Sequence, residues 1–206
     1  QGTIDSNMYL GKSVEDYYNL LPYRALALGN HEFDYGPEKK NGKDKRGAIK
    51  QRMLESKHPF VQANIFVRAT GQLWREKHLF PSVLVDAGGY KVGIIGLTTL
   101  NTPATTLPQN VDDLDFRDFV QPALAEAAKL REKGADLVLV TTHEGDGTRA
   151  GDPIERFLGA LPKGTIDGLI AGHTHTEAHL FVHDVPVIES LTRGIGFGRI
   201  DFFIDK

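Results

Sequence analysis

Three short polar segments, each placed where an apolar run ends, constrain the possible structures of this chain most strongly. They are residues 29–34 (GNHEFD), 141–145 (TTHEG) and 172–175 (GHTH), and each carries at least one histidine. Apolar runs that stop at polar, glycine-flanked ends are typical of α/β sheets, which present ligands along one edge. The pattern therefore predicts a metal site assembled from these three segments.

Composition and charge narrow the classes of function. The chain has 206 residues, 40% hydrophobic and 25% charged, so it can form one domain with an ordinary core. Its net charge of −3 shows no basic excess of the kind that favours binding to a nucleic acid polymer or an anionic membrane. The sequence contains no membrane-spanning apolar run, and it opens with polar residues rather than a signal peptide. It contains no cysteine, which excludes disulfides, thiolate ligands and a cysteine nucleophile.

Local patterns predict alternating helices and strands followed by a run of strands. Helices are predicted at 13–20, 48–57, 115–133 and 152–161, with Ser13 and Asp152 as N-caps and Gly134 ending the third. Strands are predicted at 25–28, 60–65, 82–86, 91–98, 135–140, 166–171, 178–182, 185–189 and 199–204. The charged segment 37–47 is predicted to be an exposed, mobile loop. This order favours an α/β sandwich of mixed sheets with helices outside, and a single parallel doubly wound sheet is the alternative.

The residue types in the three segments suit a divalent transition metal. Imidazole nitrogens and carboxamide or carboxylate oxygens bind Zn, Mn, Fe, Co or Ni rather than Ca. His173 and His175 are two residues apart, so on an extended segment their side chains share one face and reach one metal or two adjacent metals. His143 is expected to come from the neighbouring strand.

The first segment predicts a histidine held by a carboxylate. Asn30 and His31 are adjacent, so on extended backbone they diverge, and one can bind metal while the other faces substrate. Asp34 is close enough to hydrogen-bond His31 and fix its tautomer, which would let that histidine serve as a general acid. Glu32 and Glu144 are predicted to be possible hydrogen-bond partners of a ligand histidine, not ligands themselves.

The remaining histidines are predicted to have no part in the chemistry. His58 and His78 follow lysines in charged stretches, and we expect both to be solvated surface residues. His179 is expected in a strand and His183 in a turn, both with structural roles.

Taken in order, the motifs G-N-H-E-x-D, x-H-E-G and G-H-T-H resemble the calcineurin-like metallophosphoesterases. Within that superfamily they are similar to the 5′-nucleotidase branch, which includes periplasmic UDP-sugar hydrolases and 2′,3′-cyclic nucleotide phosphodiesterases. Supporting similarities lie at residues 1–3, 29–36, 59–65, 91–98 and 186–188. The resemblance implies that residues 1–206 form a catalytic domain with a four-layer α/β/β/α sandwich, located in the periplasm or outside the cell.

The resemblance also implies a two-metal centre that hydrolyses a small phosphate ester, most simply a 5′-nucleotide or a related nucleotide phosphate. The residues that match ligands of one metal are Asn30, His143 and His173, and His175 matches a ligand of the other. His31 matches the catalytic histidine, with Asp34 as its partner, while a metal-bound hydroxide attacks phosphorus. Two ions about 3.5–4 Å apart would stabilise the phosphorane charge.

The chain departs from the family pattern in one block. The family begins with D-x-H and then G-D, just before the part that resembles residues 1–3, and Asp5 falls after that position. Because the absent ligands form one contiguous block, we expect a missing N-terminal segment rather than a decayed site. We also expect the C-terminal specificity domain to be absent, since the chain ends soon after the last predicted strands. Three of the four ligands of one metal are then present but only one ligand of the other, so we expect this chain to hold at most one ion. Two alternatives stay open: a thiosulfohydrolase-like enzyme of sulfur oxidation, and a non-catalytic metal-binding remnant.

Overall fold

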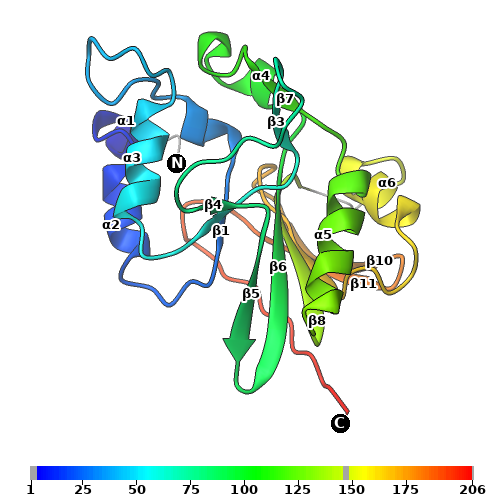
Figure 1. The fold of residues 1–206 in the computed structure, drawn as a ribbon. Coiled ribbons are helices and arrows are strands. Elements are labelled where there is room, and N and C mark those ends of the chain that lie inside the picture. The colour runs from blue at the N-terminus through cyan, green and yellow to red at the C-terminus, as the bar shows by residue number, and fades with distance from the viewer. Residues whose placement is uncertain (1–3, 146–148, 206) are drawn as a thin grey trace.

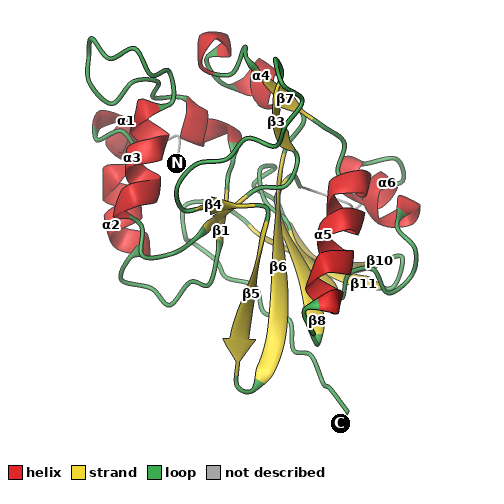
Figure 2. Ribbon diagram, viewed as in Figure 1, coloured by secondary structure: helices red, strands yellow, loops and turns green. Residues whose placement is uncertain are grey.

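The computed structural model describes residues 4–145 and 149–205, whose strands form one large sheet, one small sheet and a ribbon (Figure 2). The large sheet contains β5 (Ser82–Ala87), β6 (Tyr90–Thr98), β8 (Leu137–His143), β9 (Gly168–Ile170), β10 (Glu177–Val182) and β11 (Val185–Ser190). Its strand order is β10-β11-β9-β8-β6-β5. The small parallel sheet contains β1 (Leu26–Ala27), β2 (Phe60–Val61) and β4 (Leu79–Phe80), and the ribbon pairs β3 (Ile65–Val67) with β7 (Leu114–Phe116).

Helices lie outside both sheets (Figure 1). They are α1 (Ile4–Met8), α2 (Lys12–Tyr18), α3 (Gly47–Glu55), α4 (Thr102–Thr105), α5 (Val120–Glu132) and α6 (Pro153–Ala160), with 3-10 turns η1 (Asn30–Phe33) and η2 (Pro108–Asn110). Helix α3 packs on the small sheet, while α5 and α6 pack on the large one. The large sheet has antiparallel pairs at both ends. The mixed α/β sandwich is therefore confirmed over the single parallel sheet.

The two sheets touch where β2 crosses β6. A methyl group added at Gly96 would lie 2.2 Å from the Val61 carbonyl oxygen, so only a glycine permits this approach. The Ala63 amide donates to the Gly96 carbonyl at 2.8 Å and fastens the contact. Because close-packed layers cannot slide without opening voids, this contact fixes where the end of each sheet lies relative to the other.

The central strands of the large sheet run in the same direction. β6 pairs with β8 in parallel up to Thr98 opposite His143, and β8 pairs with β9 in parallel. Their carboxyl ends therefore meet at one edge, as the apolar runs predicted. The segments carrying His143 and His173 both emerge at that edge.

The strand predicted at 60–65 is divided into β2 and β3. The Gln62 Oε1 atom accepts the amide of Ile65 at 2.8 Å, and the Asn64 side chain bonds both the amide and the carbonyl of Thr98 at 2.8 Å. These side chains replace the backbone pairing that a continuous strand would make. The single-strand prediction was wrong because the buried Gln62 and Asn64 side chains bond to backbone groups at this point.

The helix predicted at 115–133 begins later, at Val120. Its expected first residues pair as β7 with the distant strand β3, and the Asp118 carboxylate accepts the Val120 amide at 2.9 Å. The remaining part agrees with the predicted spacing, since the residues buried against the large sheet include Ala123, Ala127 and Leu130. Gly134 follows the helix with φ of 82°, as a residue ending it requires.

Predictions near the two ends of the chain were less accurate. The strand predicted at 199–204 is absent; Phe202 instead packs its ring on Gly168, where an added methyl group would lie 2.8 Å from the ring. The helix predicted at 13–20 begins at residue 12 and has Gly11, with φ of 80°, as its N-cap instead of Ser13. Asp152 is the N-cap of α6, as predicted.

Two of the surface histidines are placed differently from the prediction. His58 is 9% exposed, and its Nε2 lies 3.1 Å from the Tyr18 carbonyl oxygen, so its solvated placement was wrong. His78 is half-buried with φ of 65°. His179 lies exposed in β10, and His183 lies in the β10–β11 turn, where its Nε2 is 3.1 Å from the Glu155 carboxylate; both locations were predicted.

The charged loop is exposed over residues 38–44 but anchored at its end. The buried Arg46 guanidinium donates to both carboxylate oxygens of Asp113, at 2.7 and 2.9 Å, and also to the Asn110 carbonyl at 3.0 Å. It lies 5.5 Å from the Trp74 ring centre. A bidentate pair of this kind is stronger than an ordinary surface ion pair, so the loop is fixed where it returns to the core.

We predict that Asp113→Asn lowers the free energy of unfolding by about 1 kcal/mol at pH 7. The estimate is modest because the Asp113 side chain is 41% exposed and water screens the pair. Hydrogen bonds from Arg46 lower the Asp113 pKa from 3.8 to about 2. The stabilisation is therefore complete above about pH 4 and disappears as the pH falls through about 2.

Urea denaturation at pH 7 and at pH 2 measures this difference. The control is Asp115→Asn, because the Asp115–Arg117 pair is well exposed on both sides and contributes little. Equal losses for the two variants, or a loss in Asp113→Asn that persists at pH 2, would contradict the prediction.

Candidate metal centre

The first motif forms one turn of 3-10 helix, η1, which begins three residues after the last residue of β1. Asn30 and His31 are thus on a helical turn, and the extended backbone assumed for them was wrong. Glu32 does not reach a histidine: its Oε2 accepts the Gly29 amide at 2.5 Å and caps the turn. The turn exists because a carboxylate three residues on satisfies an amide that the helix leaves unpaired.

His31 and Asp34 form the predicted pair. His31 Nδ1 lies 2.6 Å from Asp34 Oδ2, and since a carboxylate only accepts, Nδ1 carries the proton and donates. This hydrogen bond raises the His31 pKa, while partial burial opposes the rise. The other carboxylate oxygen, Asp34 Oδ1, accepts the Thr106 hydroxyl at 2.7 Å.

Asn30 is buried, with 2% of its surface exposed, and points its amide oxygen at His143. The distance from Asn30 Oδ1 to His143 Nε2 is 2.9 Å. The amide nitrogen of Asn30 donates to the Thr105 carbonyl at 3.1 Å, which determines that the oxygen rather than the nitrogen faces His143. Side chains following strands of the two different sheets therefore meet here.

His143, the last residue of β8, stands between the other two motifs. Its ring centre is 5.0 Å from that of His173, at 62° between the ring planes. Burial, together with the nearby His173, His31 and His175, lowers the His143 pKa to about 3. The imidazole is therefore neutral at physiological pH, which is the form that ligates metals.

The third motif is a tight loop rather than an extended segment. His173 and His175 have φ of 80° and 59°, so their side chains do not share one face as predicted. Glu189 Oε2 accepts the hydroxyls of Thr174 and Thr176, at 2.7 and 3.0 Å, and ties the loop to β11. His173 packs beside His143, whereas His175 is exposed and, within the described residues, makes no ring contact or hydrogen bond.

The donors that meet are a carboxamide and two imidazoles, from Asn30, His143 and His173. A metal ion with bonds of about 2.1 Å holds neighbouring donors about 3 Å apart, close to the 2.9 Å between Asn30 Oδ1 and His143 Nε2. This spacing and the neutral state of His143 fit a divalent ion. Across residues 4–145 and 149–205, no three His, Asp or Glu side chains are grouped so that they could hold a metal, so the amide of Asn30 is needed beside the two histidines.

Several residues that hold the site were missed by the sequence reasoning. Glu144, considered as a partner for a ligand histidine, instead accepts the Thr99 hydroxyl at 2.7 Å. Thr105, Thr106 and Glu189 belong to none of the three motifs, yet each bonds a residue of one of them. No local pattern marks them, since their roles arise from contacts between segments distant in the sequence.

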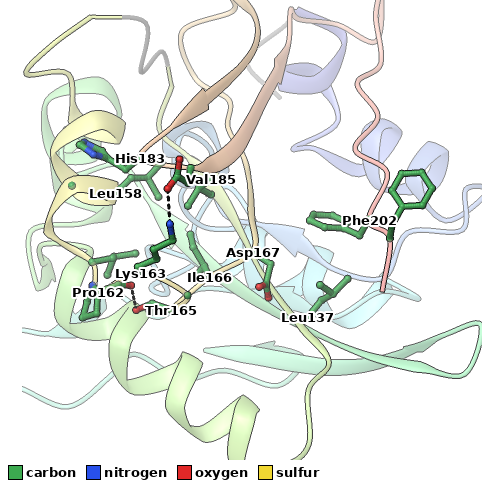
Figure 3. A pocket seen from close by; sticks show the side chains of 15 residues that line it. Leu137, Leu158, Pro162, Lys163, Thr165, Ile166, Asp167, His183, Val185 and Phe202 are labelled. Carbon is green, nitrogen blue, oxygen red and sulfur yellow. Dashed lines mark hydrogen bonds and ion pairs between the residues drawn. The ribbon is translucent and has the colours of Figure 1, made fainter. Parts of the chain in front are cut away.

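A hollow of about 480 Å³ lies at the opposite edge of the large sheet, near the starts of β8 and β9. Figure 3 shows Lys163, Asp167 and Phe202 around it. Its charged groups pair with protein partners: Lys163 with Asp184 at 2.8 Å, and Asp167 with Arg131 at 2.6 Å. The candidate site therefore remains the histidine-bearing edge.

We predict that Gly29→Ala lowers the free energy of unfolding by about 1–3 kcal/mol, the usual cost of overpacking. The new methyl group would lie 2.8 Å from three carbons of the His143 ring, although the extended backbone of Gly29, with φ of −111°, would accept alanine. Chemical denaturation measures the loss.

The matched control is Gly172→Ala. Its methyl group would meet nothing closer than the Thr142 carbonyl oxygen at 3.7 Å, so a change within about 0.5 kcal/mol is expected. Similar stability losses in Gly29→Ala and Gly172→Ala would mean that the His143 ring does not lie against Gly29.

Known proteins are similar to this chain in both sequence and fold. The chain is 33% identical over 178 residues to the snake venom 5′-nucleotidase of Naja atra, covering 85% of this chain and 30% of that protein. It is 36% identical over 164 residues to the 5′-nucleotidase of Vibrio cholerae, covering 75% of this chain and 27% of that protein. The solved structure of a 5′-nucleotidase precursor from Thermus thermophilus has a TM-score of 0.72 and 27% identity, over 93% of this chain and 38% of that one.

The chain thus spans about a third or less of the length of these relatives. No helix in the described part of the chain is long and apolar enough to cross a membrane. The sequence of residues 5–177 matches the family described as calcineurin-like phosphoesterase, and this stretch contains all three histidine motifs. The chain belongs to the calcineurin-like phosphoesterase family.

Proposed function

We propose that this domain hydrolyses phosphate esters with divalent metal ions, and that His31 and Asp34 act in the reaction. One observation carries the proposal: the hydrogen-bonded His31–Asp34 pair adjoins Asn30, whose amide oxygen lies 2.9 Å from His143 Nε2. A histidine held by a carboxylate can donate a proton to a leaving oxygen. The neighbouring metal-binding donors would place a positive ion where it stabilises the charge of the phosphoryl group.

We infer that the substrate is a 5′-nucleotide or a related nucleotide phosphate. The relatives from Naja atra and Vibrio cholerae are both named 5′-nucleotidases. They support this choice over the sulfur-containing esters of the alternative function. Since the chain matches 30% and 27% of their lengths, the inference concerns the class of substrate and not which base is preferred.

The metal would be held by donors from all three motifs. Asn30, His143 and His173 would bind one ion and His175 would contribute to a second, and Mn, Zn, Fe, Co or Ni suits this set. A bound ion would supply positive charge that stabilises the phosphoryl oxygens as the ester bond breaks. His143 supports the assignment because its burial keeps the imidazole neutral.

His31 would be the residue that contacts the substrate. Its Nδ1–H donates to Asp34, so Nε2 is the ring nitrogen that can face the ester. When protonated, Nε2 can donate to a phosphoryl oxygen or transfer its proton to the leaving oxygen. Asp34 would hold the imidazole in one orientation and one tautomer throughout.

We further propose that the protein acts in the periplasm or outside the cell. The relative from Naja atra is named a snake venom 5′-nucleotidase, and venom proteins are secreted. The absence of cysteine suits an oxidising compartment, where an unpaired thiol would be a liability.

The first test of the proposal is His31→Ala assayed on nucleoside 5′-monophosphates with Mn²⁺ or Zn²⁺. Loss of a general acid or a charge-stabilising donor is expected to reduce kcat by about 100-fold or more. The matched control is His179→Ala, because that histidine lies exposed in β10, outside the three motifs. Full activity of His31→Ala would remove this residue from the mechanism.

A second test measures metal binding directly by titration calorimetry with Mn²⁺ or Zn²⁺. His143→Ala is expected to weaken binding at least about tenfold because it deletes a central donor, whereas His179→Ala leaves the affinity unchanged. Equal affinities in the two variants would refute the assigned ligands.

The same preparations separate the proposal from its two alternatives. Hydrolysis of thiosulfate conjugates without hydrolysis of phosphate esters would identify a thiosulfohydrolase. Metal binding without turnover of any ester by the full-length protein would indicate a non-catalytic remnant. Either result overturns the proposed activity. The assignment of the metal ligands is tested separately by the calorimetry.

A further inference from the structure

A segment outside all three motifs contacts the first motif at several points. We name residues 102–110, which contain α4 and η2, the clamp segment. It makes three hydrogen bonds to residues 30–34: Asn30 Nδ2 to the Thr105 carbonyl at 3.1 Å, the Thr106 hydroxyl to Asp34 Oδ1 at 2.7 Å, and Asn110 Nδ2 to the Phe33 carbonyl at 2.7 Å. The clamp segment therefore holds the amide of a candidate ligand, the carboxylate of the pair and the backbone between them.

Thr106 is the member of the clamp segment that reaches the His31–Asp34 pair with its side chain. It follows the last residue of α4 in extended conformation, with φ of −134°, and is half-buried. Its hydroxyl donates to Asp34 Oδ1, while His31 Nδ1 donates to Asp34 Oδ2 at 2.6 Å. Each carboxylate oxygen thus has its own donor.

Two donors on opposite oxygens constrain the carboxylate more than one donor can. The terminal torsion of aspartate has a broad energy profile, so a carboxylate with a single partner can rotate and exchange its oxygens. With Thr106 bonded to Oδ1, rotation that moved Oδ2 away from His31 would also break the bond to Thr106. The plane of the Asp34 carboxylate, and with it the His31 ring, is held in one position.

We propose that Thr106 is a positioning residue, whose hydroxyl orients the Asp34 carboxylate and thereby fixes the ring orientation and tautomer of His31. Its hydroxyl bonds to Asp34 and not to His31, so it acts through the carboxylate. Its effect on turnover rests on the proposed function, whereas its effect on the His31–Asp34 hydrogen bond does not.

Three variants separate this role from general support of the fold. Thr106→Val keeps the shape of the side chain and removes the hydroxyl, and Thr106→Ser keeps the hydroxyl. The control Thr165→Val removes a hydroxyl that donates to the Pro162 carbonyl at 2.6 Å, beside the hollow at the other edge of the sheet. Circular dichroism and melting temperature establish that each variant folds.

The first measurement is proton NMR of the metal-free chain. The His31 Nδ1–H, protected by its bond to Asp34, is expected as a low-field resonance, assigned by its disappearance in His31→Gln. It should persist in Thr106→Ser and Thr165→Val and be lost or broadened by exchange in Thr106→Val. A wild-type chain without the resonance, or a Thr106→Val chain that retains it unchanged, overturns the proposal.

The second measurement is steady-state kinetics of the full-length protein with metal and a nucleoside 5′-monophosphate. Thr106→Val is expected to lower kcat by about tenfold, with KM changed less than twofold, and Thr106→Ser to restore most of the loss. In an Asp34→Asn background Thr106→Val should cost nothing further, because the group through which it acts is altered.

The outcomes distinguish this proposal from the proposed function. If the wild-type protein hydrolyses no ester while Thr106→Val still loses the resonance, the function fails and the positioning role stands. If turnover is normal in wild type and equally reduced by Thr106→Val and Thr165→Val, the effect is on the fold alone and the positioning role fails.

Discussion

The contact between β2 and β6 is the constraint on which the candidate site depends. Asn30 follows a strand of the small sheet and His143 ends a strand of the large one. Their atoms Oδ1 and Nε2 can be 2.9 Å apart only if the two sheets are held in a fixed position relative to each other. The close approach of Val61 to Gly96 sets this relative position, because a side chain at Gly96 would push the sheets apart. Packing in the core thus determines which polar groups meet at the edge.

The sequence predicts the elements well where a pattern is local and poorly where a distant segment intervenes. The buried face of α5 can be predicted from the spacing of its apolar residues. Its first residue cannot, because residues 114–116 pair with β3, which lies almost fifty positions earlier in the sequence. The division of 60–65 likewise depends on Asn64 bonding to Thr98. Periodicity carries no information about such long-range side-chain bonds.

The same distinction applies to the candidate site. The three motifs were found because histidines follow apolar runs, and the structure brings Asn30, His143 and His173 together. The conformations of the motifs could not be read from the sequence, since a 3-10 turn at Asn30 and left-handed residues in the third loop depend on their partners. The clamp segment was invisible because threonines without periodicity are common in ordinary loops.

The buried carboxylate of Glu189 is needed to hold the loop of His173 and His175 in its strained conformation. Positive φ at a residue other than glycine costs about 1–3 kcal/mol and persists only where neighbours impose it. Here Glu189, 2% exposed, holds the hydroxyls on both sides of His175, and the Leu191 amide bonds the Thr176 carbonyl. The sheet therefore maintains a strained loop that places the His173 ring beside His143, a geometry that an unconstrained loop would relax away from.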